Sequence, residues 1–189
     1  MKSKLFRLPP RWQENRLGTR HRIPKAVQTW IYESGSLTQR LRQEFGRDLA
    51  VNVLWQAGCK PFLTENRVLQ HANAEFAWVR EVLLHHQGRP LVLARTIMPR
   101  RTLAIAHGQL TKLGNRPLGE IIFAYAHLAR QALDVSYVMP NLWQPDLALL
   151  AHNAPVWGRR TVYIIEQQPL LVSEFFMPDL FTSGLTAHD

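Results

Sequence analysis

The sequence predicts a single α+β domain with an antiparallel sheet, and three observations carry this prediction. Its 189 residues are enough for one full-sized globular domain. Two pairs of apolar segments rich in β-branched residues, 77–86 with 91–98 and 160–166 with 170–177, are each joined by a short turn, which is typical of β-hairpins. Segments with apolar residues at helical spacing occur without a regular β-α-β alternation. We therefore expect helices to cover one face of the sheet.

Residues 1–25 differ from the rest of the chain. They hold three prolines, show no apolar periodicity and carry eight Lys and Arg residues against Glu14 alone. This segment therefore accounts for +7 of the formal net charge of +9, and the remainder is nearly neutral. We expect a basic flexible arm at 1–25, a globular body at 26–178 and a short polar tail at 179–189.

The body begins with a helical hairpin. Apolar residues recur at helical spacing over 26–31, residues 34–36 interrupt them, and Ser36 can cap a second short helix that starts near Leu37. A DNA-reading helix-turn-helix has the same outline, but the next segment, 51–55, has the pattern of a strand. We therefore favour an ordinary helical hairpin.

The middle of the body alternates between helix, strand and connection. Segments 101–113 and 117–133 have mostly helical patterns, separated by a Gly-Asn-Arg-Pro break at 114–117 whose proline stands at a helix start. The later part, 128–138, returns to a strand pattern. Residues 141–155 form a connection interrupted by prolines.

The composition excludes several kinds of protein. Cys59 is the only cysteine, so the chain has no intramolecular disulfide and no cysteine-based zinc site. No apolar run reaches the roughly 20 residues of a membrane span, and no apolar stretch of a signal peptide follows the basic N-terminus. The eight histidines are scattered and favour no metal site. We expect a cytoplasmic protein of a reducing compartment, without metal or cofactor.

Two charges stand at positions where a core residue is expected. Because alternate residues of a strand share a face, Glu174 is the only charge in an apolar set within 170–176. Arg80 is likewise the only charge in an apolar set within 78–84. A buried charge is costly unless it is paired or binds a ligand. Either these faces meet solvent, or Arg80 and Glu174 pair with each other, or both line a ligand site.

The register of the first predicted hairpin brings a second arginine into the argument. If Gln87 and Gly88 form a two-residue turn, Arg80 lies opposite Arg95, and like charges across a strand pair destabilise it. Arg95 shares its face with apolar residues, so an anionic ligand between the two arginines would relieve the repulsion. A three-residue loop would instead place them on opposite faces.

Two adjacent arginines open the last hairpin. In the sequence Trp-Gly-Arg-Arg at 157–160, Arg159 and Arg160 must face opposite sides of the sheet. Each is either a charge at the sheet edge or a contact to an anion, and the sequence leaves both interpretations open.

Six short stretches carry a resemblance to a known family. They are Gly-Ser-Leu-Thr-Gln-Arg-Leu at 35–41, Trp-Val-Arg-Glu-Val-Leu-Leu at 78–84, Ala-Arg-Thr-Ile-Met-Pro at 94–99, Leu-Gly-Asn-Arg-Pro-Leu-Gly at 113–119, Trp-Gly-Arg-Arg at 157–160 and Pro-Leu-Leu-Val-Ser-Glu-Phe-Phe-Met-Pro at 169–178. Each is weak alone, but six in order, ending in the Leu-Leu-x-x-Glu-x-Phe-x-Pro strand, are fairly specific. Over roughly residues 26–178 the chain resembles the chorismate pyruvate-lyase (4-hydroxybenzoate synthase) family.

The resemblance implies an antiparallel sheet of about six strands, helices on one side, and an enclosed ligand cavity under helical flaps. It implies a chorismate lyase, an enzyme that converts chorismate to 4-hydroxybenzoate and pyruvate for ubiquinone biosynthesis without metal or organic cofactor. In the family, an arginine at the position of Arg80 holds the ring carboxylate and a glutamate at the position of Glu174 meets the 4-hydroxyl; both count as catalytic candidates. Main-chain groups at Leu37 and Leu118 complete the pocket. Arg95 is a further substrate-binding candidate from the turn argument.

Two other interpretations compete with this one. Effector-binding domains of some bacterial transcription regulators resemble the same fold, but they normally follow a DNA-binding domain, and only 25 irregular residues precede the body here. Nucleic-acid binding through the basic arm lacks aromatic interleaving or a reader motif. We expect a monomer that takes chorismate as substrate, releases 4-hydroxybenzoate and binds no nucleic acid. Residues 1–25 would contact an anionic membrane transiently, at its inner face.

Overall fold

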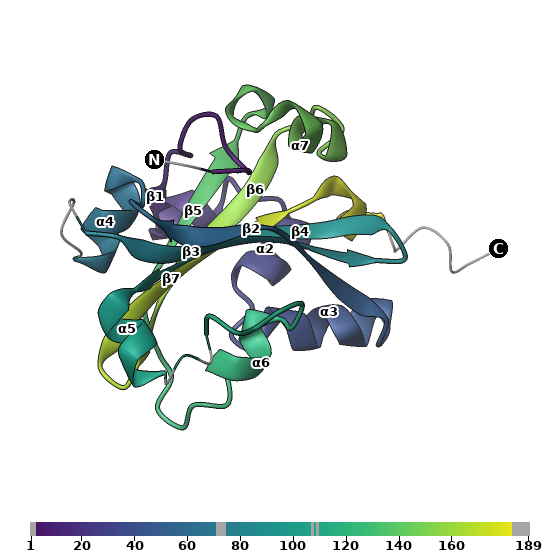
Figure 1. Ribbon diagram of the computed structural model, residues 1–189. Helices are drawn as coiled ribbons and strands as arrows, with labels where there is room; N and C mark the ends of the chain where they lie inside the picture. The colour runs from purple at the N-terminus through teal and green to yellow at the C-terminus, as the bar shows by residue number, and fades with distance from the viewer. Residues whose placement is uncertain (1–2, 71–74, 107, 109, 183–189) are drawn as a thin grey trace.

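Seven antiparallel strands form one sheet, and Figure 1 shows the helices packed around it. The computed structural model describes residues 3–70, 75–106, 108 and 110–182. The strand order is β1-β5-β6-β7-β4-β3-β2. The strands are β1 (Gln13–Glu14), β2 (Leu49–Cys59), β3 (Ala77–His86), β4 (Arg89–Pro99), β5 (Ala129–Val138), β6 (Val156–Ile165) and β7 (Gln168–Phe176). The antiparallel α+β fold is confirmed, and the two-residue β1 adds a strand to the sheet expected.

Short helices connect the strands. They are α1 (Leu17–Arg20), α2 (Lys25–Ile31), α3 (Leu37–Phe45), α4 (Leu63–Leu69), α5 (Arg100–Ile105), α6 (Leu118–Ile122) and α7 (Pro145–Leu150), with the 3-10 turns η1 (Pro140–Leu142) and η2 (Pro178–Phe181). The longest, α3, has nine residues. None of the helices in the described ranges has the length and apolar character to cross a membrane.

The helices cover both faces of the sheet, where the sequence predicted cover on one. Helices α2, α3, α5 and α6 contribute to the apolar clusters on the face that carries Glu174, called the Glu174 face below. Helices α4 and α7 contribute to those on the opposite face. The physical reason lies in β7, where Leu171 and Phe175 on the opposite face are as fully buried as Leu170 and Phe176 on the Glu174 face. A central strand that is apolar on both faces needs cover on both.

The N-terminal segment supplies part of that second cover. Leu5 and Phe6 are buried, Phe6 stacks on Trp143 with 4.7 Å between ring centroids, and the segment continues into β1, which pairs with β5. The interpretation of residues 1–25 as a flexible arm is therefore wrong for residues 3–25, because Ile23 is buried in the core as well. Its basic composition concealed an apolar anchor, because the charged side chains of this segment point to solvent while Leu5 and Phe6 point inward.

Most other predicted elements are present. The helical hairpin is confirmed as α2 and α3, with the Ser36 side chain accepting a hydrogen bond from the Gln39 backbone at 3.3 Å. Both strand hairpins and the strand at 128–138 are confirmed. The helices within 101–113 and 117–133 are shorter than predicted, and α4, α7 and β1 were not anticipated. Within the expected polar tail, Leu180 is buried and residues 183–189 lie outside the described ranges.

Candidate functional site

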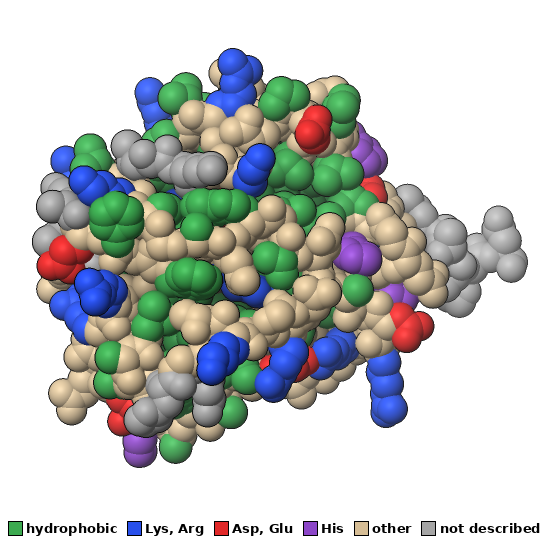
Figure 2. Space-filling model, viewed as in Figure 1, with side chains coloured by type: hydrophobic (Ala, Val, Ile, Leu, Met, Phe, Trp, Pro, Cys, Tyr) green, Lys and Arg blue, Asp and Glu red, His purple; other side chains and the backbone are tan. Residues whose placement is uncertain are grey.

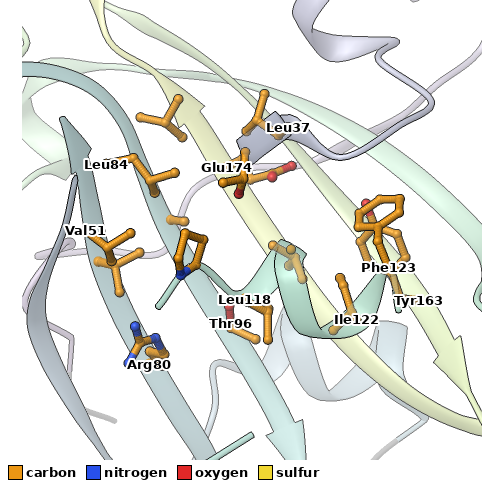
Figure 3. A pocket seen from close by; sticks show the side chains of 17 residues that line it. Leu37, Val51, Arg80, Leu84, Thr96, Leu118, Ile122, Phe123, Tyr163 and Glu174 are labelled. Atoms are coloured by element: carbon orange, nitrogen blue, oxygen red, sulfur yellow. The ribbon is translucent and has the colours of Figure 1, made fainter. Parts of the chain in front are cut away.

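A cavity lies between the Glu174 face of the sheet and the two helices α3 and α6. It encloses about 600 Å³ of empty space including its opening to solvent. Figure 3 shows the side chains that line it. The walls are mostly apolar, and the polar side chains among the lining residues are those of Thr38, Arg80, Thr96, Tyr163 and Glu174.

Arg80 supplies the positive charge of the cavity. It lies in β3 and is 2% exposed. Its Nη1 donates to Oε1 of Gln56 at 3.1 Å, and its Nη2 donates to the carbonyl oxygens of Gly114 at 2.8 Å and Arg116 at 3.3 Å. Burial lowers the pKa of Arg80, but a guanidinium stays protonated in proteins. Because its partners in the described ranges are neutral oxygens, Arg80 retains an uncompensated charge for an anion.

Glu174 supplies the negative charge, and Arg159 holds it. The two residues are direct partners on β7 and β6, and Nε of Arg159 lies 2.6 Å from Oε2 of Glu174. Nη1 of Arg159 also donates to the carbonyl oxygens of Trp30, Ile31 and Glu33, at 3.1, 3.1 and 3.0 Å. Burial lowers the pKa of Arg159, but the Glu174 carboxylate together with Tyr163 and Glu33 outweighs this and raises the pKa overall. The guanidinium therefore fixes one oxygen of a carboxylate that faces the cavity.

Arg80 and Glu174 do not pair with each other, and neither faces solvent. They stand two strands apart on the same face, at different ends of the cavity, as Figure 3 shows. The structure therefore excludes two of the three interpretations that the sequence left open, and it places both side chains in the lining of one cavity.

Arg95 does not belong to this site. The turn at Gln87 and Gly88 is as predicted, and His86 pairs with Arg89. A register shift between Leu84 and His85 moves every pair farther from the turn by one residue. Arg80 therefore faces Thr96, and Arg95 faces Glu81 on the opposite side of the sheet. The β-bulge reversed the expected side, as a one-residue slip must.

On the opposite face Arg95 is held by two carboxylates. Its Nε and Nη2 donate to Glu65 at 2.7 and 3.0 Å, and its Nη1 donates to Glu81 at 2.6 Å. Burial lowers the pKa of Arg95, but the two carboxylates outweigh it and raise the pKa. Glu81 in turn accepts from Ser3 Oγ at 2.5 Å and from the Lys4 backbone at 2.6 Å. Arg95 thus belongs to a buried ion network that anchors the N-terminal segment.

Leu37 and Leu118 are the first residues of the two helices that cover the cavity, and both line it. The helices meet closely at Gly119, where a Cβ atom would lie 3.1 Å from the hydroxyl oxygens of Ser36 and Thr38. Arg42 of α3 and Glu120 of α6 form an ion pair at 2.5 Å. This arrangement agrees with the enclosed cavity under helical flaps that the resemblance implied.

Sequence reasoning missed Tyr163, which lines the cavity and is 2% exposed. Strand parity could have predicted its position, because Tyr163 and Arg159 are an even number of residues apart in one strand and therefore share the Glu174 face. The sequence also left open whether Arg159 and Arg160 are charges at the sheet edge or contacts to an anion. In the structure Arg159 faces Glu174, whereas Arg160 pairs with Asp134 at 2.7 Å.

These features define a class of protein: an α+β domain with a mostly apolar cavity that carries a cation at one end and a carboxylate at the other. The comparisons with known proteins agree with this class. The sequence model of the family described as Chorismate lyase matches residues 11–185. The chain belongs to the chorismate lyase family.

Relatives named "Probable chorismate pyruvate-lyase" match over most of their length. The one from Methylococcus capsulatus is 42% identical over 153 residues, covering 80% of this chain and 94% of the relative. One from Thiobacillus denitrificans is 35% identical, covering 84% of this chain and 86% of the relative. One from Coxiella burnetii is 30% identical and covers both chains completely.

Solved structures with the same fold come from transcription regulators. The effector domain of PhnF from Mycobacterium smegmatis has a TM-score of 0.55 at 16% identity, covering 77% of this chain and 90% of that one. The PhnF structure itself has a TM-score of 0.57 at 16% identity, covering 80% of this chain and 67% of that one. At this identity the likeness concerns the fold alone.

Proposed function

We propose that the protein is a chorismate pyruvate-lyase, which converts chorismate to 4-hydroxybenzoate and pyruvate. The observation that carries the proposal is the placement of Arg80 and Glu174 at different ends of one apolar cavity. Chorismate and 4-hydroxybenzoate both carry a ring carboxylate and, across the ring, a hydroxyl. An arginine suits the first group and a carboxylate acceptor suits the second.

Each residue of the site then has its own role. Arg80 binds the ring carboxylate, Glu174 accepts a hydrogen bond from the 4-hydroxyl, and main-chain groups at Leu37 and Leu118 complete the contacts. In the reaction the bond between C3 and the ether oxygen breaks and C4 loses its hydrogen, so the ring becomes aromatic and enolpyruvate becomes pyruvate. Because aromatisation is strongly downhill, the main task of the protein is to hold the ether group in reactive geometry away from water.

The hydrogen of C4 has two routes: transfer to Glu174, or direct transfer to the enolpyruvyl methylene. A reaction run in deuterated water separates them. Transfer through an exchangeable acid places deuterium in the methyl group of pyruvate, whereas direct transfer leaves that group unlabelled. Mass spectrometry of the pyruvate formed gives the answer.

The activity is tested by incubating pure protein with chorismate in the presence of EDTA and following 4-hydroxybenzoate by absorbance. Catalytic release of both products supports the proposal. The second candidate, a non-catalytic effector-binding domain, is favoured by the fold shared with regulator domains. Binding of chorismate without product formation would support that candidate and refute the lyase.

We propose further that 4-hydroxybenzoate made by this protein enters ubiquinone biosynthesis and that the N-terminal segment contacts anionic membrane surfaces. Seven Lys and Arg side chains between residues 4 and 25 are exposed. Basic side chains also occur over several parts of the surface seen in Figure 2, so the proposal concerns this segment rather than a single patch. Each basic residue near an anionic surface contributes about 1 kcal/mol of attraction.

The membrane contact is tested by substitution rather than deletion, because residues 3–6 are anchored in the fold. Arg7→Gln combined with Arg11→Gln should reduce sedimentation with phosphatidylserine vesicles and leave turnover intact. Equal sedimentation of variant and wild type would refute the contact. The oligomeric state is tested separately. Light scattering on the protein alone tests the expected monomer of 21.8 kDa.

A further inference from the structure

The cavity has a third polar corner besides those of Arg80 and Glu174. Tyr163 forms it from β6, and Figure 3 shows Tyr163 beside Phe123 on the wall across from Arg80. The side chain is 2% exposed, and Arg130 supplies the hydrogen-bond partner that a buried tyrosine hydroxyl ordinarily has. None of the contacts proposed for 4-hydroxybenzoate involves this hydroxyl.

Positive charge gathers around Tyr163. The guanidinium of Arg130 lies 5.4 Å from the centre of its ring and is held by hydrogen bonds to the carbonyl oxygens of Glu33, at 2.7 Å, and Gly35, at 2.9 Å. Arg159 is fully buried on the same face of β6, and its Nη2 atom has no hydrogen-bond partner in the described ranges. Arg159 is already paired with Glu174, whereas the hydrogen-bond acceptors of Arg130 in the described ranges are neutral, so the charge of Arg130 makes this corner favourable for an anion.

The hydroxyl of Tyr163 is a donor at neutral pH. Burial raises its pKa, and the negative charge of Glu174 raises it further. The positive charges of Arg159 and Arg130 oppose this change and only partly offset it. A protonated phenol can donate one hydrogen bond to a carboxylate that enters the cavity.

Substrate and product of the proposed reaction differ by one carboxylate. 4-Hydroxybenzoate has a single carboxylate, across the ring from its hydroxyl. Chorismate has a second one on the enolpyruvyl group, which is attached through an ether oxygen to the ring carbon next to the hydroxyl-bearing carbon. With the ring carboxylate at Arg80 and the hydroxyl at Glu174, the second carboxylate lies to one side of the Glu174 end. Tyr163 is a polar group of the cavity wall that the product does not need.

We propose that Tyr163, with Arg130 behind it, binds the enolpyruvyl carboxylate of the substrate. This inference rests on the proposed function. The subsite is occupied in the substrate complex and is left empty once pyruvate departs, so it contributes to substrate binding and not to product binding. By fixing the far end of the enolpyruvyl group, it also fixes the direction of the C3–O bond that must break.

Tyr163→Phe tests the subsite because it removes the hydroxyl and keeps the ring. We expect kcat/KM for chorismate to fall at least about tenfold, the lower part of the range for losing a hydrogen bond to a charged group. The dissociation constant of 4-hydroxybenzoate, measured by titration calorimetry, should stay within about twofold of wild type. Tyr137→Phe is the matched control, because it removes the hydroxyl of a tyrosine that is 52% exposed and does not line the cavity.

A second pair of variants tests the charge behind Tyr163. Arg130→Lys keeps the positive charge and should retain more of the wild-type kcat/KM than Arg130→Met. An unchanged kcat/KM in Tyr163→Phe, or equal weakening of chorismate and 4-hydroxybenzoate, would overturn the subsite. If the wild-type protein forms no 4-hydroxybenzoate, the lyase proposal fails instead. The subsite is then decided by calorimetry, in which Tyr163→Phe should weaken chorismate binding alone.

Discussion

Nε of Arg159 lies 2.6 Å from Oε2 of Glu174, and the same guanidinium binds three carbonyl oxygens at the end of α2 and in the connection to α3. One buried side chain therefore ties the acidic end of the cavity to the segment that leads into its cover. The next residue, Arg160, offers a natural comparison. It is also buried and also pairs with a carboxylate, that of Asp134 at 2.7 Å, but on the opposite face of the sheet.

Arg159 acts as a positioning residue for Glu174. We expect Arg159→Met to lower kcat/KM for chorismate about 100-fold, comparable with losing a positioned catalytic group, and Arg159→Lys to restore part of it. Arg159→Met should lose about 3–5 kcal/mol of unfolding free energy, because it leaves the buried Glu174 carboxylate unpaired. Arg160→Met should lose less, because Asp134 is only partly buried. Only the Arg159 variants should lose activity per folded molecule, measured together with urea unfolding.

The turnover number separates positioning from general destabilisation. Because the Arg159 guanidinium holds one oxygen of Glu174, Arg159→Met should lower kcat per folded molecule. Arg160→Met should leave kcat at the wild-type value. Equal kcat in the two variants would reduce Arg159 to a structural role.

Glu174→Gln should lower kcat at least about 100-fold while the protein still binds 4-hydroxybenzoate, because the amide keeps the shape but loses the charge. Steady-state turnover and calorimetry measure the two quantities. Glu166→Gln, in the exposed turn between β6 and β7, is the control and should behave as wild type. Near-wild-type turnover in Glu174→Gln would contradict the assigned role.

Arg80→Met should act mainly on binding. Removing the cation leaves the ring carboxylate without its partner, so the dissociation constant of 4-hydroxybenzoate should rise at least about tenfold. The control is Arg116→Met, because the Arg116 side chain is exposed while its carbonyl oxygen still accepts from Arg80. Unchanged product affinity in Arg80→Met would mean that the ring carboxylate binds elsewhere.

The faces on which Arg80 and Glu174 lie could be predicted from sequence, because each depends only on local strand parity. Arg80 and Glu174 are charges in otherwise apolar sets, and a strand of known phase fixes the face on which each lies. The face on which Arg95 lies could not be predicted from strand parity alone. It depends on a β-bulge after Leu84, and its partner Glu65 comes from α4, a helix whose seven residues left too short a pattern to recognise.

The N-terminal segment could not be predicted from composition for a related reason. Eight basic residues and three prolines indicated a flexible arm, yet Leu5 and Phe6 are buried in the fold. Their burial depends on an apolar cluster built by residues such as Trp143 and Phe175, more than 130 positions away in the chain. Tertiary contacts of this separation leave no periodic signal in the segment itself.

The anchor predicts a stability effect at Ser3. Its hydroxyl donates to Glu81 at 2.5 Å and accepts from the Leu5 and Phe6 backbones at 3.1 and 3.0 Å. Ser3→Ala should therefore lower the free energy of unfolding by about 1–3 kcal/mol, since Glu81 is fully buried and loses a donor. Urea denaturation measures this. An unchanged midpoint would show that the segment contributes nothing through Ser3, and kcat/KM should stay at the wild-type value.

The close approach of α3 and α6 at Gly119 predicts an effect on product release. A methyl group there would lie 3.1 Å from the hydroxyl oxygens of Ser36 and Thr38, so in Gly119→Ala these neighbours must give by a few tenths of an ångström. We expect the two covering helices to move apart as a result. Overpacking of this kind costs about 1–3 kcal/mol, and here the strain falls on the closed form of the cavity. The dissociation rate constant of 4-hydroxybenzoate, measured by stopped-flow competition, should therefore rise at least about fivefold. Gly58→Ala is the control, because no atom lies within 4 Å of a Cβ at that position. An unchanged rate constant in Gly119→Ala would mean that the product leaves without separation of α3 from α6.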